Sequence, residues 1–134
     1  MRRIGWMPVT VAAVVMSTLP SPAALAQGPV QHTINVSVRG GSPCALATDL
    51  PNDRLSAHPG DRIVLQVAGT VPASCGVPGG ARPGMADFKM NGNPVAPPVS
   101  NNNGVYVVSS GRNGRYKFSV VLGSLVLDPE LEIN

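Results

Sequence analysis

The chain has 134 residues, of which 13% are charged, and its formal net charge is +3 at pH 7. Proteins that bind nucleic acids or anionic membranes need a basic stripe on one face, whereas the ten Lys and Arg residues of this chain are scattered. The composition therefore supports neither class.

Residues 1–26 have the pattern of a cleaved secretory signal peptide. Arg2 and Arg3 form a positive start, Val9–Leu19 is largely apolar, and Ala24-Leu25-Ala26 is a small-x-small cleavage site. The apolar run is shorter than the roughly 20 residues that a membrane-spanning helix needs. We therefore predict a periplasmic or secreted protein, residues 27–134, with no membrane attachment after cleavage.

Signal cleavage also changes the charge of the working protein. Without Arg2 and Arg3, eight basic residues oppose seven acidic residues, and the net charge falls to +1. The eight basic residues that remain are scattered, and their only cluster is Arg112, Arg115 and Lys117, which we interpret as a solvated strand face. The 108 residues of the mature chain suit one domain, which buries roughly 60–70% of the surface of its unfolded chain. No nucleic-acid partner is predicted.

The two cysteines, Cys44 and Cys75, both lie in the predicted exported part. An even number of cysteines in an oxidising compartment indicates a disulfide. The spacing is far from C-x-x-C, which disfavours a metal site or a redox pair. We therefore predict an intramolecular Cys44–Cys75 disulfide.

The first half of the mature chain contains two clear strand patterns. After a frayed start over residues 27–31, residues 33–39 alternate between apolar and polar side chains and predict a strand. Residues 44–57 show little periodicity. His58-Pro59-Gly60-Asp61 is a turn sequence that leads into residues 62–68, a strand in which Val64 breaks the polar side and suggests a central position in its sheet.

The second half begins with a segment rich in Pro and Gly, residues 71–85, which predicts a long surface loop held by Cys75. A short hairpin follows over residues 88–95, because Asn91-Gly92 favours the primed turns of hairpins. A turn over residues 101–104 then precedes a buried strand over residues 105–108.

The last residues of the chain alternate clearly between apolar and polar. Tyr116, Phe118 and Val120 face one side of a strand, and after the Asp128-Pro129 turn Leu131 and Ile133 alternate with Glu130 and Glu132. We interpret the two glutamates as charged protection of an edge strand. Since no segment shows helical periodicity over three turns, the sequence predicts an all-β sandwich.

Two of these segments resemble the cupredoxin, or blue-copper, family. The family has a Pro-Gly-Asp turn that leads into a core strand, as in residues 58–65, and a Gly-x-Tyr-x-Phe-x-Cys strand, as in residues 114–120. The tail over residues 127–133 is similar to the endings of metal-free cupredoxin-like exported proteins. The resemblance implies a Greek-key β-sandwich that forms one domain over residues 27–134.

The copper ligands of the family are missing from the matching positions. A blue-copper centre uses two histidines, a thiolate and a weak axial ligand. Val120 stands where the resemblance requires the cysteine, and residues 121–134 contain neither histidine nor methionine. We therefore predict a cupredoxin-like protein without copper, and no other cofactor or metal site.

The remaining candidate ligands are His32, His58, Met85 and Met90, which could together bind copper(I) weakly. Their order and spacing match no copper-carrier motif, and we expect both histidines to be solvated, His32 near a mobile start and His58 at the head of a turn. Ser56 lies two residues before His58, but residues so close in sequence rarely point at one reacting atom. No catalytic residue, and hence no enzyme, is predicted.

The sequence thus favours an exported binding or structural module that acts without a metal. Two Tyr, two Phe and one Trp are present, and Trp6 lies in the predicted signal peptide, so stacking platforms for sugars are scarce. A protein partner is therefore expected. One alternative is a periplasmic copper-binding or electron-transfer protein. Another is a domain that binds sugars or proteins through the loop over residues 71–85. The sequence indicates neither the identity of a partner nor an oligomeric state.

Overall fold

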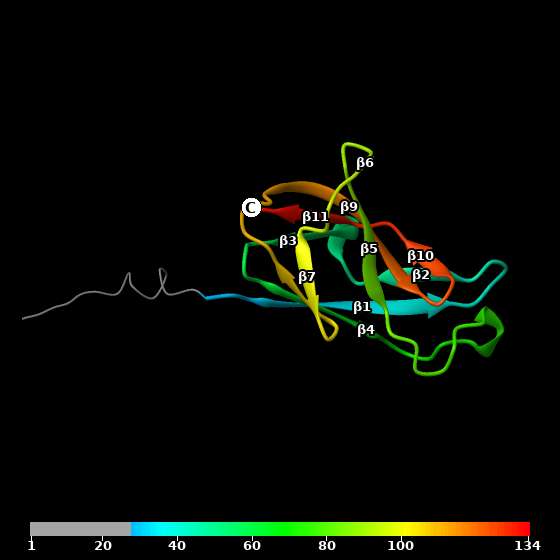
Figure 1. Ribbon diagram of the computed structural model, residues 1–134. Coiled ribbons are helices and arrows are strands. Elements are labelled where there is room, and N and C mark those ends of the chain that lie inside the picture. Colours follow the sequence, from blue (N-terminus) through cyan, green and yellow to red (C-terminus); the bar gives the residue numbers. More distant parts are fainter. Residues whose placement is uncertain (1–27) are drawn as a thin grey trace, which may run out of the picture.

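Residues 28–134 are described by a computed structural model and fold into two mixed β-sheets that pack together (Figure 1). The predicted all-β sandwich is confirmed, whereas its Greek-key connectivity stays a prediction. The predicted signal peptide, residues 1–26, lies outside the described residues.

The first sheet has five strands, and its centre is the parallel pair of β1 and β4. The other pairs in this sheet are antiparallel. In spatial order the strands are β2 (Ala45–Thr48), β1 (Gln31–Arg39), β4 (Arg62–Val67), β8 (Val105–Val108) and β7 (Val99–Asn102).

The second sheet has six strands, and β9 lies at its centre. One half of β9 pairs with β11 and the other half with β10, while β5 pairs on its opposite side. The strands are β3 (Arg54–Ala57), β11 (Glu130–Ile133), β9 (Gly114–Leu122), β5 (Gly84–Met90), β6 (Asn93–Pro94) and β10 (Leu125–Leu127). Two single-turn 3-10 helices, η1 (Pro51–Asp53) and η2 (Ala73–Cys75), lie in the connections.

The core forms between the sheets because the inward residues of each strand are aliphatic or aromatic. In β1 every second side chain is buried, and in β9 Tyr116, Phe118 and Val120 are buried while Arg115 and Lys117 are exposed. Phe118 stacks on Phe88 from β5, with ring centroids 5.8 Å apart. The alternation read from the sequence therefore identified the core face of both strands.

The segment between Cys44 and Ala57, which showed little periodicity, contains two strands that the sequence analysis missed. β2 and β3 have four residues each. Leu46 is the only fully buried side chain of β2, and β3 contributes Leu55 and Ala57. Strands this short contain too few inward positions for a period to be recognised.

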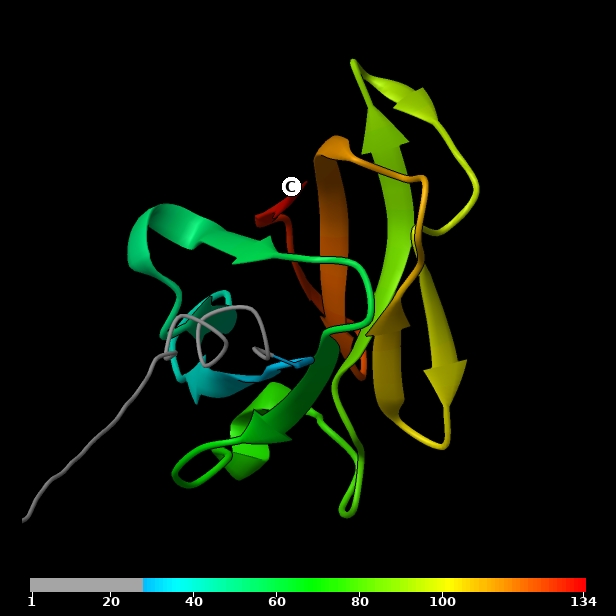
Figure 2. The ribbon, with the colours of Figure 1, turned by 90° about the vertical axis from the view of Figure 1, so that its left-hand side faces the viewer.

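The hairpin predicted over residues 88–95 is confirmed by the pairing of β5 with β6. Asn91 and Gly92 both have positive φ, at 53° and 80°, as a primed turn requires. Both ribbon views show this hairpin projecting from the sandwich (Figures 1 and 2). β5 also contains a bulge, since its register with β9 shifts between Ala86 and Lys89, and Asp87 has a φ of 53°.

The interpretation of β11 as an edge strand is wrong. β11 lies between β3, with which it is parallel, and β9, with which it is antiparallel. Glu130 meets Arg54 and Lys117 from the two neighbouring strands, with N–O distances of 3.1 and 3.8 Å. The glutamates therefore belong to a row of cross-strand ion pairs on the outer face of the sheet, and β3 is the edge.

Replacing Ile133 with alanine is expected to lower the free energy of unfolding by about 2–4 kcal/mol, because it removes buried methyl and methylene groups and leaves a cavity. The side chain is 2% exposed. Urea unfolding measures the loss. Glu132→Ala on the same strand is the control and should cost about 1 kcal/mol or less; similar midpoints for both variants would contradict the packing of β11.

The described chain starts and finishes at one end of the sandwich (Figure 1). Near its start, Arg62 N donates to Val30 O at 2.9 Å, and at its finish Asn134 N donates to Ala57 O at 3.0 Å. The turn over residues 58–61 joins Ala57 to Arg62, and each of these two residues makes one of the two contacts. At the opposite end lie the β1–β2 turn, the β4–β5 loop and the β9–β10 turn.

Candidate functional site

Asp61 is the most extensively hydrogen-bonded side chain at the end where the described chain starts. Its Oδ1 accepts from Val30 N at 3.0 Å, and its Oδ2 accepts from His58 N and from His32 Nε2, each at 2.9 Å. The backbone turns sharply before it, since Gly60 has a φ of 89°. Asp61 is 3% exposed, so this carboxylate ties β1 to the turn before β4.

The hydrogen bonds keep Asp61 ionised. Burial alone would raise the pKa of Asp61, but hydrogen bonds from Val30 N–H, the His32 ring and His58 N–H outweigh burial and lower the pKa below its ordinary value. Because an ionised carboxylate can only accept, the bonded Nε2 of His32 is the donor.

The structure corrects the prediction for His32. β1 begins at Gln31, and the preceding Val30 is hydrogen-bonded through both its N–H and its C=O, so this part of the chain start is not frayed. The His32 side chain is 21% exposed and pairs with Asp61. His58 fits its prediction better, because 71% of its side chain is exposed. Its Nδ1 lies 3.9 Å from Oδ2 of Asp61.

A hollow of about 290 Å³ lies beside Asp61. Its lining consists of Gly28, Pro29, Val30, His58, Pro59 and Asp61. Both carboxylate oxygens of Asp61 already accept from the protein, so the arrangement explains a structural role for this carboxylate.

The four candidate copper ligands divide between the two sheets. His32 and His58 meet at Asp61, whereas Met85 and Met90 lie on β5 of the second sheet. Among residues 28–134, no group of three or more His, Cys, Asp or Glu side chains is placed to hold a metal ion. Val120, at the position of the family cysteine, is fully buried in β9 opposite Met85.

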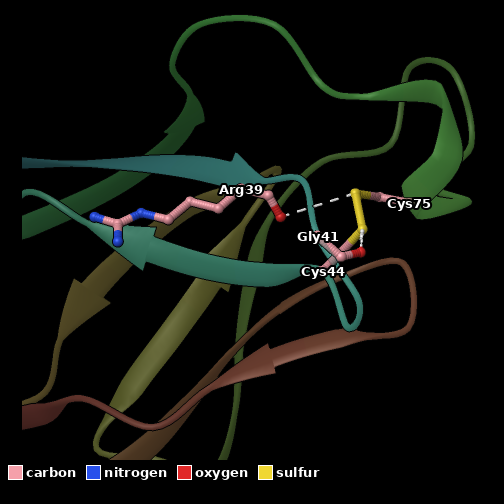
Figure 3. Close-up of a disulfide and its surroundings, with 4 residues drawn as sticks. All are labelled: Arg39, Gly41, Cys44 and Cys75. Carbon is pink, nitrogen blue, oxygen red and sulfur yellow. Dashed lines mark hydrogen bonds between the residues drawn. A yellow bond between two sulfur atoms is a disulfide. The ribbon is translucent and has the colours of Figure 1, made fainter.

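The predicted disulfide between Cys44 and Cys75 is present and joins the β1–β2 turn to the β4–β5 loop (Figure 3). The two sulfurs lie 3.7 Å from Gly41 O and 3.9 Å from Arg39 O. Because oxidised sulfurs have no proton to donate, these are close S···O contacts that accompany the covalent link. The loop is therefore attached to the end of β1.

Three chain segments without any charged residue meet at the end of the sandwich that contains the disulfide, opposite the end where the described chain starts. All fifteen charged residues of the described chain lie outside them. The segments are Gly40–Thr48, Val67–Ala81 and Ser119–Leu127. We call the surface that they form the neutral end.

In addition to the disulfide, two glycines of the neutral end lie next to prolines of the β4–β5 loop. A Cβ on Gly40 would lie 3.4 Å from Cγ of Pro72 in the loop. A Cβ on Gly123 would lie 3.4 Å from Cδ of Pro78, and Gly123 has a φ of 61°. The turns of both sheets thus pack against the β4–β5 loop.

The neutral end contains a hollow of about 360 Å³ beneath the β4–β5 loop. Its wall combines apolar side chains with backbone groups. The lining residues are Val67, Val71, Pro72, Ala73, Val77, Pro78, Gly79, Gly80, Ala81 and Leu122. In the third of the uncharged segments, Val126 of β10 is 54% exposed, the more exposed of the two exposed large hydrophobic side chains of residues 28–134.

Two of the three residues of the basic cluster lie on a solvated strand face, as the sequence analysis predicted. Arg115 and Lys117 project from the outer face of β9 and lie 3.8 Å from Glu132 and Glu130 respectively. Arg112 donates from its guanidinium to Ala96 O at 2.7 Å. Arg115 and Lys117 are therefore partly neutralised on a solvated strand face, whereas Arg112 is half-buried and lies before the start of β9.

No protein-family model and no curated protein matches the chain. Within residues 28–134, no helix has the length and hydrophobicity needed to cross a membrane. The sequence analysis found the loop and the disulfide of the neutral end but missed the shared absence of charge, which could have been seen by marking the charged residues along the sequence.

Proposed function

We propose that the protein is an exported, non-catalytic binding module that contacts a protein partner through the neutral end. The observation that carries the proposal is the convergence of three uncharged segments on one end of the sandwich, where two of them line a hollow. Protein interfaces are depleted of charge at their centre, and loops on a rigid sandwich commonly provide the contacts. The Cys44–Cys75 disulfide supports export, because such bonds persist in oxidising compartments.

The cupredoxin-like resemblance remains part of this proposal. The sandwich and the turn over residues 58–61 agree with it, and the buried Val120 supports a scaffold that has no thiolate for copper. We place the protein in the periplasm or the surrounding medium after removal of residues 1–26. An intact mass that still included Trp6 would contradict this cleavage.

The proposal is tested by affinity capture from the compartment to which the protein is exported. Ala73→Glu and Val126→Glu each place a charge on the neutral end, and Gln31→Glu places one at the opposite end as the matched control. We expect that the parent and Gln31→Glu retain a partner protein and that both neutral-end variants lose it. Equal retention by all four proteins, or no retained protein, would refute the proposal.

Added Cu(II) is expected to produce no intense visible absorption in the purified, oxidised protein. The thiolate-to-copper charge transfer that colours a blue-copper centre requires a cysteine, and both cysteines form the disulfide. The visible spectrum after dialysis and metal analysis measures this. An intense band with stoichiometric retained copper would favour the electron-transfer alternative, while weak binding to an exposed imidazole such as His58 would not.

A further inference from the structure

One edge of β4 has no strand partner over its second half. β8 pairs with β4 through Arg62, Ile63 and Val64, and the chain then turns away at Gly104. Residues 65–67 continue to pair with β1 on the other side. We call their free side, which faces away from β1, the β4 edge. In Figure 1, β4 lies along the lower side of the sandwich and leads into the β4–β5 loop.

The direction of the backbone groups at the β4 edge follows from the bonds that β4 makes to its partner. Arg62 N and Ala68 N donate to Val30 O and Val36 O at the β1 side, at 2.9 and 2.8 Å. Alternate residues of a strand direct their N–H groups to opposite sides. The N–H groups of Leu65 and Val67 therefore point toward the free side.

A hollow of about 440 Å³ lies along this edge. It shares Val67 and Ala81 with the hollow of the neutral end, so the two hollows adjoin. Its lining residues are Val64, Leu65, Gln66, Val67, Ala81, Arg82, Pro83, Asn103, Gly104 and Val105. Arg82 is the only charged residue of this lining, it is exposed, and it has no ion pair within residues 28–134.

Other edges of the sandwich carry features that oppose the addition of a strand. β6 contains Pro94, which cannot donate to a ladder, and β5 is interrupted by the bulge at Asp87. β3 begins with the charged Arg54. The β4 edge contains neither a proline nor a charge, and the same is true of β2, β7 and β10. The β4 edge differs from these strands in lying along the 440 Å³ hollow beside Arg82.

We propose that the β4 edge binds an extended, aliphatic segment of the partner protein as an added strand, with an acidic residue of that segment beside Arg82. This inference rests on the proposed function and names its binding mode. An added strand satisfies the N–H groups of Leu65 and Val67, the apolar wall takes alternate side chains, and the unpaired guanidinium takes the carboxylate. A concave, edge-on hollow suits a peptide better than a flat lipid surface.

The experiment selects peptides from a random heptapeptide library on the purified, oxidised protein. Enriched sequences are expected to be aliphatic and β-branched with an acidic residue near one end. Bound peptide should shift the amide resonances of Leu65 and Val67. N-methylation of the peptide at successive positions should weaken binding about tenfold at every second residue, because only alternate N–H groups enter the ladder.

Arg82→Glu is expected to weaken the selected peptide about tenfold, and replacing the acidic residue of the peptide with lysine should restore binding to this variant. Lys89→Glu, on the outer face of the second sheet, is the control and should leave binding unchanged. No enriched peptide, N-methylation effects without alternation, or amide shifts confined to other strands would overturn the strand addition.

The capture experiment separates this inference from the proposed function. A partner lost with Ala73→Glu and Val126→Glu but fully retained by Arg82→Glu would leave the neutral end as the binding surface and refute the β4 edge. Self-association of the parent in sedimentation, abolished by Arg82→Glu, would identify a second copy as the occupant and would refute the separate partner.

Discussion

Replacement of Asp61 with alanine is expected to destabilise the fold by about 3–5 kcal/mol. The variant removes a buried charge that accepts hydrogen bonds from Val30 N, His58 N and His32 Nε2, and it leaves these donors without their acceptor. Urea unfolding at neutral pH measures the loss.

Asp49→Ala is the matched control for this variant. Asp49 also accepts from a backbone N–H and a side chain, both of Asn35, but it is exposed. Exposed polar contacts contribute little, so about 1 kcal/mol or less is expected. Equal midpoints for the two variants would show that Asp61 does not hold β1 to the turn.

The contribution of Asp61 should also depend on pH. Its folded-state pKa lies below the ordinary value of 3.8, because its hydrogen bonds favour the charged form despite burial. The stabilisation is therefore fully present above the unfolded-state pKa and is lost as the pH falls through the lower folded-state pKa. The difference in stability between the parent and Asp61→Ala should narrow in acid; a constant difference from pH 7 to strong acid would contradict this.

The double variant Cys44→Ser with Cys75→Ser is expected to unfold with a free energy about 3–4 kcal/mol lower than that of the parent. The disulfide joins residues separated by 31 positions, and the chain-entropy model gives this value for a loop of that length. Urea unfolding of the oxidised parent and the variant measures it.

The neighbouring serines provide the control for the disulfide variant. Ser42→Ala with Ser74→Ala changes two exposed residues of the same turn and loop and should leave the midpoint close to that of the parent. An unchanged midpoint for the cysteine variant would mean that the contacts of Gly40 and Gly123 with the β4–β5 loop hold this loop without the disulfide.

Strands with several inward side chains could be predicted from the sequence, because their alternation spans enough residues to be recognised. β1, β4 and β9 all contain such a run. β11 has four residues, and it was predicted because the Asp128-Pro129 turn marks its start. β2, β3 and β10 could not be predicted, since they have three or four residues each and their pairing partners are chosen by tertiary packing. β11 was wrongly predicted to be an edge strand, because the last strand of the sequence need not be the last strand of the sheet. Its partners are also chosen by tertiary packing.

The candidate site was only partly accessible from the sequence. The disulfide followed from the number of cysteines and the predicted compartment. The pairing of His32 with Asp61 joins residues 29 positions apart, and its only local signal was that His32 is in phase with the buried Ile34 and Val36. The neutral end required the topology, because three separate segments had to be placed at one end of the sandwich.

The position of β11 between β3 and β9 has a kinetic consequence. Arg54 and Glu130, which pair between β3 and β11, are 76 residues apart, so a long loop must close before the second sheet is complete. Proteins dominated by such distant pairings fold in roughly milliseconds to seconds. Until residues 130–133 dock, β3 has no strand neighbour and half of β9 is an open edge. Completion of this sheet is therefore expected to be a late step, and a chain shortened before Glu130 would lose β3 from the sheet along with β11.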